Sequence, residues 1–242
     1  MKGLFITFEG TEGSGKSTQI ALLAGRLRDL GHAVLLLREP GGTPIGEEIR
    51  HTLKHSNANH AMMAETELLL MNASRAQLVR EVIRPALQSG AIILCDRFYD
   101  STVAYQGFGR GLDSATVRQT IACAVGDTRP DLTLLLMVPV EVSEMRRRAR
   151  LLPGLEMVRD RMEEADRAFF QRVEQGYRSL AAAEPDRVRT IDATASPTAV
   201  SQEIWNRVAP LLQAVEIGGK NPVVDNAAAS ATVTVPKKKL SF

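Results

Sequence analysis

Short apolar runs alternate with longer segments of helical periodicity along the chain. Two of the runs, 92–94 and 134–136, are continuously apolar, which is typical of strands that a parallel sheet buries on both faces. Because such runs and helical segments alternate, the pattern predicts an α/β fold with a central five-stranded parallel sheet flanked by helices. The predicted strands are 4–8, 33–37, 91–95, 132–138 and 188–191.

The segments between these apolar runs are predicted to be helices. Gly31 and Gly90 are placed to end helices, and Ser196 followed by Pro197 is typical of a helix start. Pro85 predicts a kink or an end within the third helix, because proline lacks the backbone N–H donor. The predicted helices are 16–30, 44–53, 64–88, 114–125, 140–149, 159–183 and 197–214.

Length and composition indicate one main domain. A chain of 242 residues with 44% hydrophobic content can bury a single core, and no internal repeat is visible. From residue 216 onward the composition shifts to small residues and valine and closes with a run of lysines. We therefore expect a domain over 1–215 and a mobile tail over 216–242, which is either a solvated appendage or a segment that binds a partner or a polyanion.

Net charge, hydropathy and the cysteines indicate which partners and which cellular compartment to expect. A net charge of +2 does not predict a nucleic-acid surface. We find neither a signal-peptide pattern nor an apolar stretch of membrane-spanning length, so we expect no membrane partner. Cys95 and Cys123 form no CxxC motif, which favours two buried, reduced thiols in a cytoplasmic protein.

A glycine-rich loop follows the first predicted strand and precedes the first predicted helix. Its glycines let the backbone curl, so that successive N–H groups and the helix N-terminus point at one spot and hold phosphate. In a loop of this spelling Lys16 reaches the β- and γ-phosphates of a nucleotide, and Ser17 holds Mg²⁺. The alternative is a glycine-rich turn without a ligand. The loop residues are Gly10, Thr11, Glu12, Gly13, Ser14, Gly15, Lys16, Ser17 and Thr18.

The turn after the second predicted strand is a further candidate, because ligands of open α/β sheets bind at the carboxyl ends of the strands. Pro40 and the paired glycines within 38–43 predict a tight turn that holds Arg38 and Glu39 near the sheet. A cis bond before Pro40 is compatible with this turn. The alternative is a surface turn with ordinary charges.

Asp96 and Arg97 follow the third predicted strand. Asp96 is placed to hold Mg²⁺ beside the phosphate loop, directly or through water. The planar guanidinium of Arg97 offers two parallel donors to an acceptor phosphate. Alternatively, the two side chains pair with each other at a helix end.

Arg75 interrupts an apolar stretch of the long predicted helix. An arginine that faces a core needs a partner, because burying its charge alone is costly. That partner is either a ligand or a carboxylate such as Glu67 or Glu81, and the residues by themselves favour the carboxylate.

A dense basic segment flanks a Pro-Gly break at 153–154. Guanidinium groups on both sides of such a break predict a lid over about 146–163, which closes on phosphates and excludes water. A solvated, charged helix face is an equal alternative. The arginines are Arg146, Arg147, Arg148, Arg150, Arg159 and Arg161.

Together these segments resemble the bacterial thymidylate kinases, in order and at the usual spacing of that family, from about residue 4 to about residue 212. The match is specific because several separate motifs agree. They are FEGTEGSGKST at 8–18, REPGGT at 38–43, SRAQ at 74–77, DRF at 96–98, AYQG at 104–107, GRGL at 109–112, RPD at 129–131 and GY at 176–177.

The resemblance implies a P-loop NTPase-type three-layer sandwich, usually a homodimer. It implies transfer of the γ-phosphate of MgATP to dTMP, giving dTDP and ADP for dTTP synthesis. Glu12 would lie near the acceptor sugar, Arg97 near the acceptor phosphate and Arg75 at the thymine edge, while Tyr105 would crowd the position of a 2′-hydroxyl. The implied acceptor-binding residues are Arg38, Glu39, Pro40, Met71, Arg75, Arg97, Ser101, Thr102, Tyr105 and Gln106.

In this family a catalytic arginine sits either in the phosphate loop or in the lid. The variable positions of the loop carry no arginine here, so the resemblance assigns the role to the lid. A well-placed arginine stabilises the charge of the transferring phosphoryl group. The implied catalytic residues are Lys16, Arg97 and Glu12 together with the lid candidates Arg147, Arg148 and Arg150.

The chain departs from the family pattern at three places. Met71 stands where an aromatic ring usually stacks on thymine, Met137 stands where an aspartate is common, and the lid carries a longer apolar insert at 151–158. Sulfur packs on a ring with less geometric definition than an aromatic plane does. Met71 therefore leaves open a kinase for another pyrimidine nucleotide or for a deoxynucleoside.

A second alternative is a phosphate-loop protein that binds nucleotide without catalysis. The sequence contains no Asn-Lys-x-Asp segment for reading guanine, which argues against a GTPase switch. Lys16, Ser17 and Asp96 are all present, which argues against lost catalysis.

Overall fold

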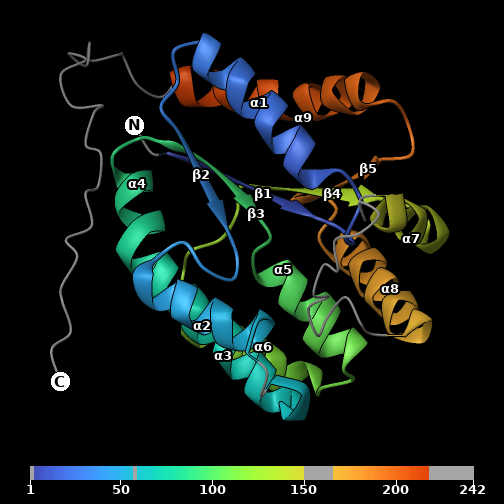
Figure 1. Cartoon of the computed structure of the whole chain (residues 1–242). Helices are drawn as coiled ribbons and strands as arrows, with labels where there is room; N and C mark the ends of the chain where they lie inside the picture. The colour runs from blue at the N-terminus through green and yellow to red at the C-terminus, as the bar shows by residue number, and fades with distance from the viewer. Residues whose placement is uncertain (1–2, 57–58, 150–165, 218–242) are drawn as a thin grey trace, which may run out of the picture.

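A single parallel sheet forms the centre of the molecule. A computed structural model describes residues 3–56, 59–149 and 166–217, and its five strands lie in the order β2-β3-β1-β4-β5 (Figure 1). All neighbouring strands run parallel, which confirms the predicted sheet. The strands are β1 (Leu4–Glu9), β2 (Val34–Arg38), β3 (Ile92–Asp96), β4 (Leu132–Met137) and β5 (Val188–Asp192).

Helices cover both faces of this sheet, so the predicted three-layer sandwich is confirmed (Figure 1). In chain order they are α1 (Lys16–Asp29), α2 (Pro44–Lys54), η1 (Asn59–Ala61), α3 (Ala64–Leu78), η2 (Val79–Ile83), α4 (Arg84–Gln88), α5 (Tyr99–Thr102), η3 (Val103–Gly109), α6 (Ser114–Val125), α7 (Val140–Ala149), α8 (Arg167–Ala183) and α9 (Pro197–Ile217). Ile6 of β1 packs in the core under α1 and α9, whereas Phe5 packs in the core under α3 and α6. None of the described helices combines the length and hydropathy that crossing a membrane requires.

The order of the strands places the phosphate loop at the switch point of the sheet. All residues of β1 are buried, and its neighbours are β3 on one side and β4 on the other. The chain builds one half of the sheet through β2 and β3 before it crosses to β4 and β5. Ligands of such sheets bind where the order reverses, beyond the carboxyl end of the central strand.

Two helical segments, α5 and η3, follow Arg97 directly and were not predicted. Buried side chains of η3, among them Ala104 and Tyr105, pack with Phe169 and Tyr177 of α8 in one cluster, which continues to Leu135 of the sheet. Gly176 of α8 permits this contact, since a Cβ there would lie 3.0 Å from the Cα of Ala104. A partner far along the chain therefore stabilises η3, and local periodicity does not reveal it.

The long third helix is interrupted near Pro85 but does not end there. The π-helical segment η2 joins α3 to α4, and Pro85 is the second residue of α4. A π-helical turn shifts the hydrogen-bonding register, which accommodates the donor that proline lacks. The predicted kink is thus a local change of helix type, and the chain stays helical to Gln88.

Three details correct the sequence predictions. The predicted helix 159–183 does not continue through residue 166: the side chain of Asp166 accepts the N–H of Phe169 at 2.7 Å and caps α8, which begins at Arg167, and residues 159–165 lie outside the described residues. α9 continues to Ile217 rather than ending at residue 214, and residues 218–242 of the predicted tail lie outside the described residues. Cys95 is buried as expected, but Cys123 is exposed on α6.

Candidate functional site

The phosphate loop forms a tight curl between β1 and α1. Gly10 has a φ of 133°, and a Cβ there would lie 2.2 Å from the carbonyl oxygen of Leu136. Gly15 has a φ of 94° and precedes the first residue of α1, Lys16. The Nζ of Lys16 donates to the carbonyls of Gly10 at 3.2 Å and Thr11 at 3.1 Å. The loop is therefore folded around its own lysine.

Several buried side-chain oxygens near this loop have no hydrogen-bond partner among the described residues. Buried polar atoms are almost always paired, so unpaired ones that gather at one place indicate a missing polar ligand. These atoms are Thr11 Oγ1, Ser14 Oγ, Glu39 Oε1 and Asp96 Oδ1.

Asp96 and Ser17 fit a magnesium site. They line one cleft together with Lys16, and a carboxylate and a hydroxyl are the oxygen ligands that Mg²⁺ prefers. In proteins Mg²⁺ usually keeps several waters and is held by one or two carboxylates together with substrate phosphates. Within the described part of the chain Asp96 forms no ion pair with Arg97, so the alternative of a simple pair between them is not found.

The cleft around the loop, called the phosphate cleft below, is strongly basic. Burial, followed by the charge of nearby Arg97, lowers the pKa of Lys16 to about 8. A phosphate placed in this cleft would favour the charged form of Lys16, because an opposite charge stabilises the ammonium group. The basic side chains that line the cleft are Lys16, Arg38, Arg50, Lys54 and Arg97.

A second cleft, called the acceptor cleft below, adjoins the first. It contains all of the predicted acceptor-binding residues except Arg38, which lines the phosphate cleft instead. Glu12 and Arg97 line both clefts and so form part of a shared wall. The predicted residues in the acceptor cleft are Glu39, Pro40, Met71, Arg75, Arg97, Ser101, Thr102, Tyr105 and Gln106.

Arg97 stands on the shared wall in an uncommon backbone conformation. Its φ is 71°, in the left-handed region that costs a non-glycine residue roughly 1–3 kcal/mol. Its guanidinium donates to Ser101 Oγ at 3.0 Å and to the hydroxyls of Tyr177 and Tyr105, each at 3.2 Å. Glu12 of the loop lies 4.0 Å away, and 18% of the Arg97 side chain is exposed. The donors are thus held in place with one edge open to a ligand.

Glu9, the last residue of β1, is a site residue that the sequence pattern did not single out. Its carboxylate accepts hydrogen bonds from Ser101 Oγ at 2.6 Å, the Tyr177 hydroxyl at 2.8 Å and the N–H of Phe98 at 2.7 Å. Burial raises the pKa of Glu9. Because Ser101 and Tyr177 also contact Arg97, Glu9 helps to orient that guanidinium. An acidic residue inside a buried strand, directly before the loop, was the signal for it.

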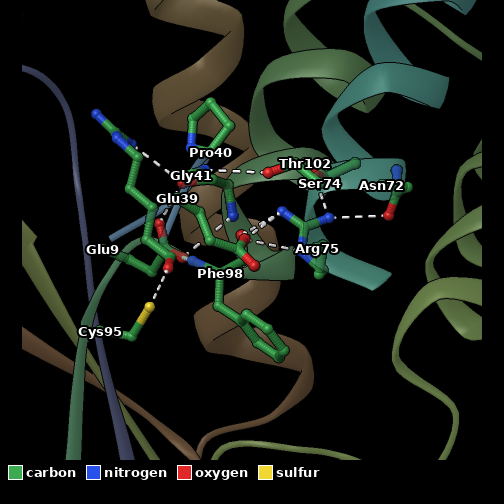
Figure 2. A network of polar contacts seen from close by, with 12 residues as sticks. Glu9, Glu39, Pro40, Gly41, Asn72, Ser74, Arg75, Cys95, Phe98 and Thr102 are labelled. Atoms are coloured by element: carbon green, nitrogen blue, oxygen red, sulfur yellow. Dashed lines mark hydrogen bonds and ion pairs between the residues drawn. The ribbon is translucent and has the colours of Figure 1, made fainter. Parts of the chain in front are cut away.

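Arg75 pairs with a buried carboxylate, as its position predicted, but that carboxylate belongs to Glu39 (Figure 2). Its Nη2 lies 2.8 Å from Oε2 of Glu39, and its Nε donates to the same oxygen at 2.8 Å. Burial, opposed by Arg75, raises the pKa of Glu39 to about 7. Glu67 instead pairs with Arg110 at 3.0 Å, and Glu81 is exposed. The prediction of Glu67 or Glu81 is therefore wrong, because the turn after β2 brings Glu39 closer.

The other donors of Arg75 link α3 to α5 (Figure 2). Nη1 donates to Asn72 Oδ1 at 2.8 Å and to Thr102 Oγ1 at 2.9 Å. Nη2 also donates to the carbonyl of Phe98 at 3.2 Å. Every N–H of this guanidinium has a protein acceptor, so Arg75 holds together the walls of the acceptor cleft.

The turn after β2 is anchored rather than free. The bond between Glu39 and Pro40 is cis, and both residues are buried. The N–H of Gly41 donates to Ser74 Oγ on α3 at 3.0 Å, and Arg38 donates to the carbonyl of Pro40 at 3.0 Å. The alternative of an ordinary surface turn is therefore not found.

Three further residues that line the clefts were not predicted from the sequence. Arg50 and Lys54 lie four residues apart on α2, so one face of that helix turns both toward the phosphate cleft. That spacing could have identified Arg50 and Lys54 from the sequence. Phe170 of α8 lines the acceptor cleft from a distant part of the chain, and no local pattern marks it.

Of the predicted lid, Arg146 is described in full. It joins the phosphate loop to the segment after β5, since it donates to the carbonyl of Gly13 at 3.4 Å and to that of Ala193 at 3.0 Å. The apolar insert at 151–158 lies outside the described residues. So do the side chains of Arg147 and Arg148 and the whole of Arg150.

Comparisons with known proteins agree with this geometry. A family model described as thymidylate kinase matches residues 8–204. A thymidylate kinase of Thermomicrobium roseum is 49% identical over 209 residues, which cover 86% of this chain and 96% of that protein. One of Syntrophotalea carbinolica is 50% identical over 201 residues, covering 83% and 93%. The crystal structure of thymidylate kinase from Ehrlichia chaffeensis aligns with a TM-score of 0.69 at 31% identity, over 86% of this chain and 100% of that chain.

Proposed function

The chain belongs to the thymidylate kinase family, and from that premise we propose how its two clefts divide the reaction. The reaction is transfer of the γ-phosphate of ATP to dTMP, giving dTDP and ADP. The observation that carries the division is the wall that the clefts share, which Arg97 and Glu12 line from both sides. A donor phosphate in one cleft and an acceptor phosphate in the other would meet at this wall.

The phosphate cleft binds ATP. The N–H groups of the loop and the N-terminus of α1 hold the phosphates, and Lys16 neutralises them from inside the curl. Ser17 and Asp96 would hold Mg²⁺, which when bound shields the charge of the phosphates. Unpaired oxygens such as Asp96 Oδ1 support this assignment.

The acceptor cleft binds dTMP. Arg97, with its open edge on the shared wall, receives the acceptor phosphate as a two-donor fork. Glu12 and Tyr105 lie beside the sugar, and the base lies against Met71 and Gln106. The apolar side chain of Met71 offers a surface for the thymine ring and its methyl group.

Catalysis then consists of positioning and charge stabilisation, with little covalent work by the protein. Lys16 and Arg97 both line the phosphate cleft, so each would neutralise charge on a phosphoryl group that is transferred there. No dedicated general base is needed for this transfer. A lid arginine completes the set of charges, and its candidates are Arg147, Arg148 and Arg150.

ADP release from MgATP should depend strongly on the acceptor that is offered. With dTMP, dUMP, UMP and CMP supplied separately at matched concentrations, we expect dTMP to be used best. Its methyl group packs on Met71, which is worth about tenfold over dUMP for a buried methyl. If a different acceptor is used best, the enzyme is still a nucleotide kinase, but its substrate is that acceptor. No release with any of the four would indicate a nucleotide-binding protein without catalysis.

Tyr105→Ala should weaken discrimination between dUMP and UMP, which differ only by the 2′-hydroxyl. Tyr105 is 6% exposed, and its ring packs edge-on against Tyr177 and Phe169. Removing a ring that fills the space of a 2′-hydroxyl should raise relative use of UMP by about tenfold. The ratio of kcat/KM values measures this. Tyr105→Phe is the control, because it keeps the ring and loses the contact with Arg97; unchanged selectivity in Tyr105→Ala would contradict the steric role.

We further propose that the enzyme works in the cytoplasm as a homodimer whose fold extends through Ile217. The free thiol of Cys95, buried in the core, suits a reducing compartment. Large apolar side chains lie exposed on or next to α2 and α3, where a second copy would cover them. They are Ile45, Met63 and Leu69.

A further inference from the structure

Gln106 offers an amide of fixed orientation to the acceptor cleft. It belongs to η3, lines the cleft, and is 1% exposed. Its Nε2 donates to Oε1 of Glu67 at 2.8 Å. Glu67, on α3, is also 1% exposed, so water does not compete for this contact.

Glu67 determines which end of that amide faces it. A carboxylate only accepts hydrogen bonds, and Arg110 already donates to both of its oxygens, at 3.2 Å from Nε and 3.0 Å from Nη2. If the amide of Gln106 turned over, its oxygen would face a carboxylate oxygen in a buried site, where two acceptors repel. The pair of Glu67 and Arg110 therefore keeps the amide nitrogen on its own side.

The amide oxygen of Gln106 is consequently the group left for a ligand. No described residue donates a hydrogen bond to this oxygen. In thymine the ring nitrogen N3 carries a hydrogen, whereas in cytosine the same nitrogen is an acceptor. A fixed acceptor in the cleft matches the first base and opposes the second.

We propose that Glu67 is a positioning residue for base selection: by holding Nε2 of Gln106 it directs the amide oxygen to the N3–H of thymine and thereby disfavours cytosine. This inference rests on the proposed function. Glu67 lies on the same helix as Met71 and Arg75, at intervals of four residues, so the three share one face of α3, and Met71 and Arg75 line the acceptor cleft. The sequence shows this spacing, but only the fold brings Gln106 to Glu67.

The test is Glu67→Gln, assayed with dTMP and dCMP. A glutamine at position 67 can present either an oxygen or a nitrogen, so the amide of Gln106 is free to turn over. We expect KM for dTMP to rise about tenfold with a smaller change in kcat, and the preference for dTMP over dCMP to fall by about the same factor. N3-methyl-dTMP, which lacks the N3 hydrogen, should lose less relative to dTMP with Glu67→Gln than with the wild-type enzyme.

Glu81→Gln is the matched control. Glu81 also accepts a hydrogen bond from a glutamine, since Gln77 Nε2 donates to it at 2.7 Å, but that pair is exposed and away from both clefts. Its substitution should leave both kinetic constants and the base preference unchanged.

Gln106→Met separates base selection from a purely structural role of the ion pair. It removes the amide but leaves Glu67 paired with Arg110. It should lower the preference for dTMP over dCMP, and Glu67→Gln should then have no further effect on that preference. If Glu67→Gln does not fold, an unchanged base preference in Gln106→Met still overturns the inference.

Three outcomes would overturn the inference. They are an unchanged base preference in Glu67→Gln, an unchanged preference in Gln106→Met, and equal losses with dTMP and dCMP that appear in kcat. Failure of the wild-type enzyme to use dTMP would contradict the proposed function itself, and it would be seen before any variant is tested.

Discussion

Replacing Lys16 by alanine is expected to lower kcat/KM with ATP and dTMP by roughly a hundred- to a thousandfold. Lys16 is 7% exposed and lies inside the loop, where burial lowers its pKa to about 8. In such a site water screens charge weakly. Removing this positive charge beside the donor phosphates should therefore lower kcat/KM strongly. Steady-state ADP release measures the effect.

The fold should survive this substitution. Among the described residues, the Nζ of Lys16 donates hydrogen bonds only to the carbonyls of Gly10 and Thr11, both within the loop itself. Thermal unfolding should therefore change little. Arg28→Ala, on the exposed face of the same helix and away from both clefts, should keep full activity. Wild-type turnover in Lys16→Ala would overturn the assignment of the phosphate cleft.

Arg97→Ala should lower kcat/KM by roughly a thousandfold, since a well-placed arginine is worth that much in phosphoryl transfer. The guanidinium stands on the wall that both clefts share and is held by Ser101, Tyr105 and Tyr177. Without it the acceptor phosphate loses its two-donor fork, so KM for dTMP should rise as kcat falls. Initial rates over a range of dTMP concentrations separate the two effects.

Two further variants show whether geometry or charge is responsible. Arg97→Lys keeps a positive charge but loses the planar fork, so its activity should lie between that of Arg97→Ala and the wild type. Arg178→Ala removes an arginine from an exposed ion pair with Glu174 and should have no effect. Alanine tolerates the left-handed backbone at residue 97 about as well as arginine does, so circular dichroism should show an unchanged fold. If Arg97→Ala turns over dTMP normally, the acceptor phosphate binds elsewhere.

Much of the fold could be predicted from the sequence, because it depends on local pattern. The continuous apolar runs are buried strands, and a predicted helix such as 114–125 ends at the predicted residues. The phosphate loop could be recognised from spelling and context alone, since its glycines meet steric demands that no other residue meets. At Gly10 a Cβ would collide with the carbonyl of Leu136. Such constraints act on one residue at a time and can therefore be recognised in the sequence.

Predictions failed where a residue depends on a partner far along the chain. The helical turn of η3, which ends at Gly109, packs on α8, which begins only at Arg167. The carboxylate partner of Arg75 is Glu39 on a different element, although Glu67 and Glu81 are nearer in sequence. Spacing along a helix identifies residues that share a face, but it does not show which distant element that face meets.

The sequence by itself determined that this chain is a phosphate-loop protein with a parallel sheet, and its resemblance to the thymidylate kinases identified the reaction and nearly all residues of the acceptor cleft. Periodicity, steric constraint and motif spelling are properties of neighbouring residues, so one chain displays them. The tertiary structure decided how these residues act together: that Arg97 is held by Ser101 and Tyr177, and that Glu67 orients Gln106. Hydrogen bonds and burial between distant segments exist only after the chain has folded, because only folding removes the water that would compete for them.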